Sequence, residues 1–390
     1  MCRYDITTSS SSLGFLRSKP SPKVILLGLL FLSAFFVSSG CGSDEQGAGQ
    51  GGSGFGDDTV RRLDRAIAEQ MRADDLPGVV VGVWVPGEGE YVVARGKANL
   101  KTGEKRDVDD PFRIGSITKT FVATAILQLV DEGKLSKGDK LAKWYPDFPN
   151  AEKITVGHLL RMQSGIRDPS EPFEHYGSPE EVIEASAILG DAFLLPGQST
   201  EYTNINYLFF GEIIGKVSGR DTGDRIAQSI LEPLGMKNTV YPTNDDLPGD
   251  LHGYGLDYSS GELKDTTSFN TIPVGGAGAM ISDVSDLKTW AKVVCTGKLL
   301  KDDTQRARLH TQHLQGFPDF VGYGEGIMKF ASFCGHQGNT PGFSSDMRYL
   351  PEKDATIIVN VNLTAEYGST SSEALAEAII KILFPKHVEW

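Results

Sequence analysis

Cysteine is scarce in this chain of 390 residues, which has four in all. So few cysteines supply neither a multi-cysteine metal site nor a disulfide-dense scaffold. Its longest apolar run, from Val24 to Val37, is shorter than the roughly 20 residues that a bilayer-spanning helix needs. Runs of basic residues are missing as well, and the net charge is −13. We therefore expect no nucleic-acid partner.

The first forty residues have the pattern of an export signal. Arg17, Lys19 and Lys23 precede the apolar run, and the small residues of "SSGC", which ends at Cys41, follow it. This order is typical of secretory signals. The segment "SSGC" also resembles a bacterial lipobox, whose cysteine is lipidated. We expect residues 1–40 to be a lipoprotein-type export signal and Cys41 to carry a membrane anchor, with a secreted or signal-anchored protein as the alternative.

A flexible tether follows the expected lipidation site. Residues 41–58 are rich in Gly, Ser and Gln and contain few apolar residues, a composition typical of linkers. Residues 59–390 are long enough for a folded domain with a sizeable core, which we expect outside the cytoplasm. There Cys295 and Cys334 can form a disulfide, and two separately buried thiols are the alternative.

The two ends of this domain carry strand patterns. A helical pattern in "DTVRRLDRAIAEQMRADDLPG" precedes two alternating strands around Pro86 and Gly87, and "VGYGEGIMKFA", "SSDMRYL" and "ATIIVNVN" precede a final amphipathic helix, "SSEALAEAIIKIL". The middle, from about 134 to 310, is mostly helical in pattern. We predict an α+β fold, an α/β sandwich in which helices flank an antiparallel sheet built from both chain ends, with a mostly helical insert facing it.

A serine at the start of a predicted helix has two interpretations. Ser116 follows Gly115 in "FRIGSITKTFVATAILQLVDEGKLS", and Lys119 comes one turn later. A serine there can be a helix N-cap and the lysine a surface charge. Alternatively, Ser116 is a nucleophile and Lys119 its base, provided that burial lowers the lysine pKa. The spacing alone decides nothing, because Ser285–Lys288 repeats it inside an ordinary helical segment.

Several blocks resemble the serine β-lactamase and penicillin-recognising DD-peptidase superfamily, closest to its class C β-lactamase and D-alanyl-D-alanine carboxypeptidase branch, which also contains esterases. The block around Ser116 is similar to the first motif of that branch. Then "ITVGHLLRMQSGI", "LLPGQSTEYTNINYLFFGEIIGKVSG" and "GGAGAMISDVSDLKTWAKVV" follow in the family's order. The resemblance implies a β-lactamase/transpeptidase-like fold and hydrolysis through a serine acyl-enzyme. We expect neither a metal ion nor a cofactor.

The resemblance also assigns roles to residues of the first two motifs. It implies that Ser116 is the nucleophile and that Lys119 and Tyr202 form the proton-transfer pair. Asn204 is then expected to hold Lys119 or the substrate amide. Without the resemblance, Tyr202 and Asn204 read as a buried tyrosine and a turn asparagine.

The third motif departs from the common Lys-Thr-Gly pattern. The literal "KTG" at Lys101–Gly103 precedes the nucleophile, whereas the family motif comes late, so we assign the motif to "GHQGNTPGF", with His336 and Gly338. The resemblance implies an oxyanion hole formed by the backbone N–H groups of Ser116 and Asn339. We expect Gly338 to leave a strand edge free for substrate, and His336, unless it is only a loop histidine, to titrate near pH 6.5 beside a substrate carboxylate.

We expect a small-molecule or peptide substrate: a peptidoglycan stem peptide, a β-lactam or an ester. A D-alanyl-D-alanine carboxypeptidase-like or β-lactamase-related hydrolase is our first hypothesis. An esterase of the same fold and a non-catalytic, lipid-anchored cell-wall-binding protein are the alternatives. An α/β-hydrolase is excluded because Gly-x-Ser-x-Gly is missing. His310 and His313 have His-x-x-His spacing, which we interpret as a solvated helix and not a metal site.

Overall fold

The computed structural model describes residues 54–190, 195–257, 260, 262–364 and 371–388, all within the unit Gly49–Trp390. The expected export signal, Cys41 and most of the tether lie outside these residues. Within the described ranges, no helix is both long and apolar enough to cross a membrane.

One antiparallel sheet joins the two ends of the folded unit, as the sequence predicted. The strand order is β2-β1-β12-β11-β10-β9-β8-β7, so β1 near the start of the unit pairs directly with β12 near its end. The strands are β1 (Gly78–Val85), β2 (Gly89–Gly96), β7 (Gln312–His313), β8 (Val321–Tyr323), β9 (Met328–Phe330), β10 (Phe333–Thr340), β11 (Phe343–Leu350) and β12 (Ala355–Val361).

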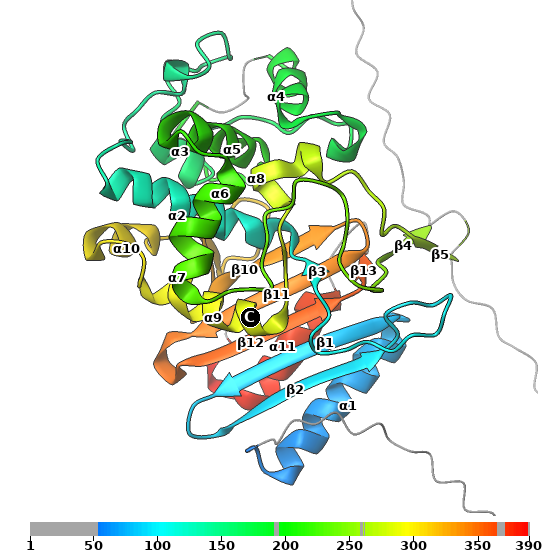
Figure 1. Cartoon of the computed structure of the whole chain (residues 1–390). Coiled ribbons are helices and arrows are strands. Elements are labelled where there is room, and N and C mark those ends of the chain that lie inside the picture. The colour runs from blue at the N-terminus through cyan, green and yellow to red at the C-terminus, as the bar shows by residue number, and fades with distance from the viewer. Residues whose placement is uncertain (1–53, 191–194, 258–259, 261, 365–370, 389–390) are drawn as a thin grey trace, which may run out of the picture. The chain divides into compact units, whose positions relative to one another are not determined.

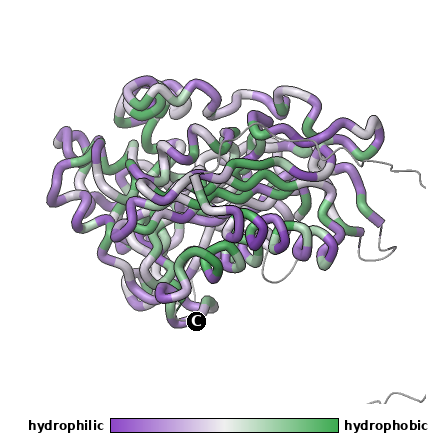
Figure 2. Tube along the Cα trace, turned by 90° about the horizontal axis from the view of Figure 1, so that it is seen from below, coloured by the Kyte–Doolittle hydropathy of each residue, from purple (hydrophilic) through white to green (hydrophobic). Residues whose placement is uncertain are grey.

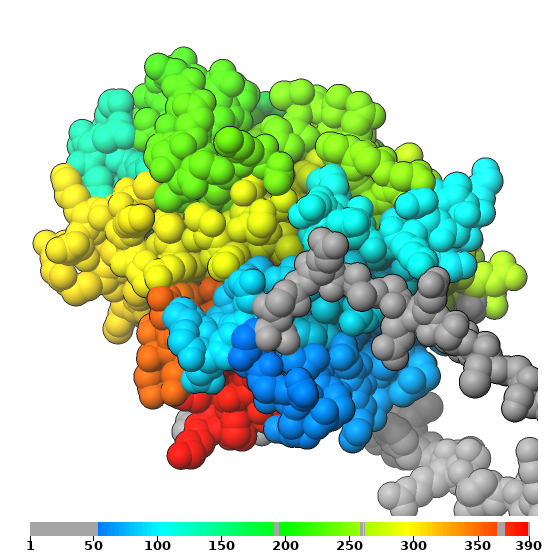
Figure 3. Space-filling model, turned by 60° about the horizontal axis from the view of Figure 1, so that its bottom comes forward, coloured from blue at the N-terminus to red at the C-terminus, as the bar shows by residue number. Residues whose placement is uncertain are grey.

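Helices cover both faces of this sheet. Every residue of β1, β11 and β12 is buried, which suits the nearly continuous apolar sequences of β1 and β12. Figure 2 shows hydrophobic residues running along the central strands. Helix α11 (Ser371–Leu383) packs on one face beside α1 (Asp57–Ala73), and α9 (Val284–Thr296) packs on the other (Figure 1). The space-filling view shows α1 and the C-terminal segment side by side (Figure 3).

The helical insert is built around α2 (Thr118–Asp131). Nearly all of its residues are buried, polar ones such as Lys119 included, so it is surrounded by the core. It packs against α5 and α8. The other helices are α3 (Val156–Leu160), α4 (Pro179–Ile188), α5 (Ile205–Ser218), α6 (Thr222–Ile226), α7 (Glu232–Leu234), α8 (Gly275–Gly278) and α10 (Asp302–Arg308).

Two small sheets lie in and beside the insert. The short strand β3 (Phe112–Arg113), just before Ser116, pairs with β6 (Ile281–Ser282). The strands β4 (Tyr254–Asp257), β5 (Glu262–Asp265) and β13 (Leu363–Thr364) form the other sheet. The middle region was predicted to be mostly helical, and the strands β4, β5 and β6 within it were not predicted.

Cys295 and Cys334 form a disulfide, with their Cα atoms 6.0 Å apart. Of the two alternatives that the sequence left, separate thiols are therefore wrong. The bond ties the last turn of α9 to β10, the strand that carries the late motif.

The interpretation of His310 and His313 as one solvated helix is wrong. Helix α10 ends at Arg308, His310 follows it, and His313 lies in β7. Both side chains are exposed. In the part of the chain that the structure describes, no group of three or more His, Cys, Asp or Glu side chains is arranged to hold a metal ion.

Candidate active site

Ser116 lies in a 3₁₀ turn, Gly115–Ile117, that leads directly into α2. The residues at the cap positions are Ile114 for the turn and Ile117 for the helix. The helix-cap interpretation of Ser116 is therefore wrong. Its side chain is half-buried. Because its hydroxyl caps neither the turn nor the helix, the hydroxyl can interact with another group.

That partner is Lys119, whose side chain is completely buried. Its Nζ lies 2.9 Å from Ser116 Oγ, 2.8 Å from Asn204 Oδ1 and 2.7 Å from the backbone oxygen of Ala277. The surface-charge interpretation of Lys119 is therefore wrong. Ala277 belongs to α8, in the Gly-rich block "GGAGAM", so two segments far apart in sequence fix the amine beside the serine.

Burial lowers the pKa of Lys119 to about 7, although the nearby negative charge of Asp168 opposes this shift. The three contacts suit both protonation states. The ammonium donates to all three oxygens. The neutral amine has two hydrogens, which the carbonyl oxygens of Asn204 and Ala277 accept, and its lone pair then faces the hydroxyl of Ser116. The site can therefore hold or release a proton at Nζ without leaving a buried group unpaired.

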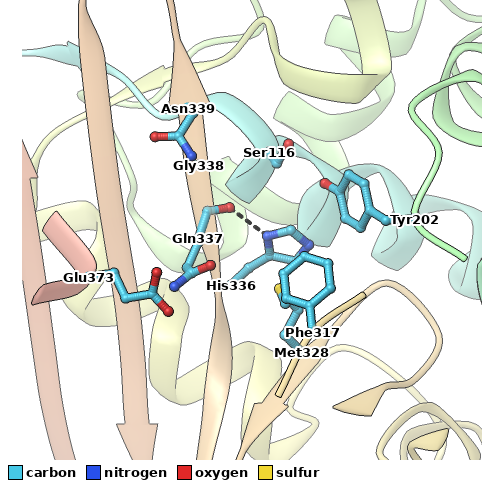
Figure 4. A pocket seen from close by; sticks show the side chains of 9 residues that line it. All are labelled: Ser116, Tyr202, Phe317, Met328, His336, Gln337, Gly338, Asn339 and Glu373. Carbon is cyan, nitrogen blue, oxygen red and sulfur yellow. Dashed lines mark hydrogen bonds between the residues drawn. The ribbon is translucent and has the colours of Figure 1, made fainter. Parts of the chain in front are cut away.

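Tyr202 lies beside this pair. Figure 4 shows its hydroxyl and Ser116 pointing toward one another. Lys119 Nζ is 5.0 Å from the centroid of the Tyr202 ring. Burial raises the pKa of Tyr202 well above its ordinary value, and a hydrogen bond with Ser116 opposes the shift only in part. Tyr202 is therefore a neutral phenol at ordinary pH, and Lys119 is the group of the pair that changes its protonation.

Asp168 positions Asn204, and the sequence analysis missed it. The Asp168 carboxylate accepts hydrogen bonds from Asn204 Nδ2 at 2.8 Å, from the Asn204 backbone N at 2.8 Å and from Thr203 Oγ1 at 2.6 Å. It therefore turns the amide oxygen of Asn204 toward Lys119. The only sequence signal is that Asp168 lies two residues after the end of "ITVGHLLRMQSGI", a block that resembles the family.

His336 lies next to the site but does not behave as expected. Its side chain is buried on β10, its Nδ1–H donates to the Gln337 backbone oxygen at 2.6 Å, and Tyr323 Oη lies 3.5 Å from Nε2. Burial, with a smaller contribution from Lys119, lowers its pKa to about 3. The prediction of an unperturbed histidine that titrates near pH 6.5 is therefore wrong, because an imidazolium ion would be buried and would lie near the positive charge of the Lys119 ammonium.

The packing around Gly338 gives a further reason for a glycine at this position. A Cβ atom at Gly338 would lie 1.9 Å from the Ile114 oxygen and 3.1 Å from the Ser116 nitrogen. Across the same contact, Gly115 has a φ of +50°, and a Cβ there would lie 2.5 Å from the Asn339 nitrogen. The two glycines therefore bring the backbone amides of Ser116 and Asn339 close together, as the predicted oxyanion hole requires.

A pocket of about 260 Å³ opens at Ser116 and runs along the edge of β10. Strand β9 pairs only with Phe333–Gly335, so within the described residues the next five positions of β10 have no second strand partner. Figure 4 shows Tyr202, His336 and Phe317 on one side of the strand and Gln337 with Glu373 on the other. Glu373, in the first turn of α11, is a second residue that the sequence analysis missed.

The repeated Ser-x-x-Lys motif has none of these contacts. Ser285 Oγ donates to Asp283 Oδ1 at 2.9 Å, and Lys288 Nζ lies 4.7 Å from the Trp84 ring centroid. The structure thus separates the two motifs by their surroundings.

Residues 63–380 match the protein family described as beta-lactamase. The chain belongs to the beta-lactamase family. Members of this family are serine hydrolases, and this chain is a hydrolase of that superfamily. The expected β-lactamase-like α+β fold is confirmed.

The chain is also similar to three individual proteins. Protein flp from Staphylococcus aureus (strain N315) is 27% identical over 339 residues, which are 83% of this chain and 67% of that protein. D-amino acid amidase from Ochrobactrum anthropi SV3, in complex with L-phenylalanine amide, has a TM-score of 0.75 at 26% identity, with 84% and 97% of the two chains covered. The octameric penicillin-binding protein homologue from Pyrococcus abyssi has a TM-score of 0.71 at 28% identity, with 83% and 77% covered.

Proposed function

We propose that this protein hydrolyses small amides or esters through an acyl-enzyme on Ser116. One observation carries the proposal: the buried amine of Lys119, with a pKa of about 7, lies 2.9 Å from Ser116 Oγ. A serine hydroxyl is a weak nucleophile until a base takes its proton. A lysine with this pKa is a base at neutral pH and an acid once it has taken the proton.

The reaction has two halves. Neutral Lys119 takes the proton of the Ser116 hydroxyl while Oγ attacks the substrate carbonyl carbon, and the N–H groups of Ser116 and Asn339 donate to the resulting oxyanion. The Lys119 ammonium, together with the Tyr202 hydroxyl, then returns a proton to the leaving amine or alcohol as its bond to carbon breaks. In the second half, water attacks the acyl-serine and the same groups transfer its proton to Oγ.

We favour amides and simple esters as the substrates of this protein. Where the common family motif has the lysine of Lys-Thr-Gly, which carries a fixed positive charge, this chain has His336. The low pKa of His336 leaves its side chain neutral. D-amino acid amidase, a structural relative, acts on amides according to its name. A D-alanyl-D-alanine carboxypeptidase or β-lactamase activity is the second candidate, because the family match and the similarity to a penicillin-binding protein homologue favour it.

The test of the proton-transfer pair uses Lys119→Ala, Tyr202→Phe and the double variant, with kcat/KM measured on one uncharged p-nitrophenyl ester. Each single change should cost about 100-fold or more, and the double variant should be barely worse than the poorer single one, because groups that act as one unit are strongly non-additive. Losses that multiply would show that the two residues do not act together.

We also propose that the mature protein is a lipoprotein anchored outside the cytoplasm through Cys41, with residues 41–58 as tether and residues 59–390 as the hydrolase domain. The export-like segment before Cys41 supports this, and so does the disulfide between Cys295 and Cys334, since disulfides persist mainly in oxidising compartments. A membrane-bound hydrolase there has access to cell-wall peptides and to small extracellular acyl compounds.

A further inference from the structure

A second pocket, of about 220 Å³, lies at the disulfide between Cys295 and Cys334, and both cysteines belong to its lining. The two side chains are almost fully buried, so the pocket is what gives access to them. A water molecule takes about 30 Å³ of liquid volume, so the pocket has room for a molecule of several heavy atoms. Met328 lines this pocket and also the pocket at Ser116. A small molecule can therefore reach the disulfide close to the active site.

The two sulfur atoms lie in different electrostatic surroundings. Cys334 of β10 pairs with Lys329 of β9, so the two side chains project from the same face of the sheet. Lys329 also lines the pocket and is the one charged residue among the described residues of its lining. Cys295, by contrast, lies in the last turn of α9, where the helix dipole is negative. A thiolate is therefore stabilised at Cys334 and disfavoured at Cys295.

This difference decides how a thiol would open the disulfide. In thiol–disulfide exchange, a thiolate attacks one sulfur and the other sulfur leaves as a thiolate, and the more stable thiolate leaves faster. Cys334 is then the leaving group and Cys295 the sulfur that is attacked. The ammonium of Lys329 also attracts the incoming thiolate, as a neighbouring lysine does at reactive cysteines.

We propose that the disulfide between Cys295 and Cys334 is a site of exchange with small thiols. The thiolate of such a thiol enters the pocket and attacks Sγ of Cys295. A new S–S bond forms to Cys295, the bond between the two cysteines breaks, and its electron pair leaves on Sγ of Cys334. The product is a mixed disulfide on Cys295 and a thiolate at Cys334 beside Lys329. The last turn of α9 is then no longer tied covalently to β10, the strand of His336 and Gly338.

The first experiment determines which cysteine carries the thiol. The full chain is incubated briefly with 2-mercaptoethanol and quenched with N-ethylmaleimide, which alkylates free thiols, and its peptides are mapped by mass spectrometry. We expect the mercaptoethanol on Cys295 and the maleimide on Cys334, while the peptides of Cys2 and Cys41 are scored separately. The reverse pattern would overturn the proposal. So would a bridge that stays closed at thiol concentrations that open a solvent-exposed reference disulfide.

A series of thiols tests the role of Lys329. The exchange rates of 3-mercaptopropionate and cysteamine are each divided by the rate of the same thiol on the reference disulfide, which cancels their intrinsic reactivities. In the wild type, the relative rate should be about fivefold higher for 3-mercaptopropionate, because the Lys329 ammonium attracts its carboxylate and repels the ammonium of cysteamine. Lys329→Gln should bring the two relative rates close together.

Lys298→Gln is the matched control. It removes an exposed lysine three residues after Cys295, outside the pocket lining, and should keep the wild-type ratio. Equal relative rates in the wild type, a wild-type ratio in Lys329→Gln, or an equal loss in Lys298→Gln would each contradict the proposal.

Dilute urea separates entry through the pocket from exchange in unfolded protein. The folded protein reacts through its pocket, so the rate should stay nearly constant well below the unfolding midpoint. A rate that rises in step with the unfolded fraction would show that the bridge opens only on unfolding and would overturn the proposal. None of these measurements uses ester turnover, so they test the exchange site separately from the acyl-enzyme function.

Discussion

At the scale of single residues, Lys119 lies in a buried site that disfavours its charged form, and its hydrogen-bond partners suit both the ammonium and the neutral amine. Desolvation lowers its pKa to about 7, while Asn204 and Ala277 accept its hydrogen bonds whether it is an ammonium or an amine. A base near neutrality is what proton transfer from a serine requires.

This predicts a pH profile for the acylation of an uncharged ester. Below about pH 7, Lys119 is protonated and has no lone pair for the Ser116 proton, so kcat/KM should rise about tenfold per pH unit and level off above about pH 7. His336→Asn should keep the same midpoint, because His336 stays neutral throughout this range. A wild-type rate that is flat between about pH 5.5 and 8, or a midpoint that disappears in His336→Asn, would contradict the assignment.

How much of the site the sequence reveals depends on how local the contact is. Ser116 and Lys119 are three residues apart, so helix geometry puts them on one face, where they can meet, but the same spacing at Ser285 and Lys288 brings no such contact. Asp168 and Glu373 reach the site only through tertiary packing, and neither lies in a pattern that separates it from an ordinary surface carboxylate. The sequence predicted His336 at the site but not its protonation state, because burial decides that.

At the scale of elements, the site depends on a close approach between β10 and the turn before α2. The lack of a side chain at Gly338 permits this approach, since a Cβ would lie 1.9 Å from a backbone oxygen. The neighbouring helix α8 contributes the backbone carbonyl of Ala277, which accepts a hydrogen bond from Lys119 Nζ. The three elements hold the nucleophile, the oxyanion donors and the base as one unit.

Gly338→Ala should therefore reduce kcat/KM by about 100-fold or more, because β10 must move away from Ser116 and misplace the Asn339 amide. Gly138→Ala is the matched control, since a Cβ there meets its nearest atom at an ordinary 3.6 Å. Activity on an uncharged ester and thermal unfolding should be measured for both variants. Wild-type activity in Gly338→Ala would mean that this approach does not matter.

The elements differed in how well the sequence predicted them. The β1–β2 hairpin, with two strand-like segments around Pro86 and Gly87, and α11, with its helical pattern, were both predicted. The strands β4, β5 and β13 are very short, and β13 pairs with β4 across more than a hundred residues, so no local pattern indicated them. Strand β10 carries polar residues at its open edge, and only the family resemblance indicated it.

At the scale of the whole molecule, the proposed lipid anchor is tested by fractionation in a bacterial host. The wild-type protein should separate with membranes and incorporate labelled fatty acid, because an acylated Cys41 holds the chain to a bilayer. Cys41→Ser should block processing or release the protein, whereas Cys2→Ser should change neither result. A soluble wild-type protein without lipid would refute the anchor and leave the hydrolase assignment untouched.

The central claim is that Ser116, and not the second Ser-x-x-Lys serine, forms the acyl-enzyme. Intact mass spectrometry after incubation with a fluorophosphonate tests it most directly, since one adduct forms on each activated serine. The wild type and Ser285→Ala should each gain one adduct at similar rates, because Ser285 only donates to Asp283. Ser116→Ala should gain none. Labelling of Ser116→Ala at the wild-type rate, or its loss in Ser285→Ala, would contradict the account.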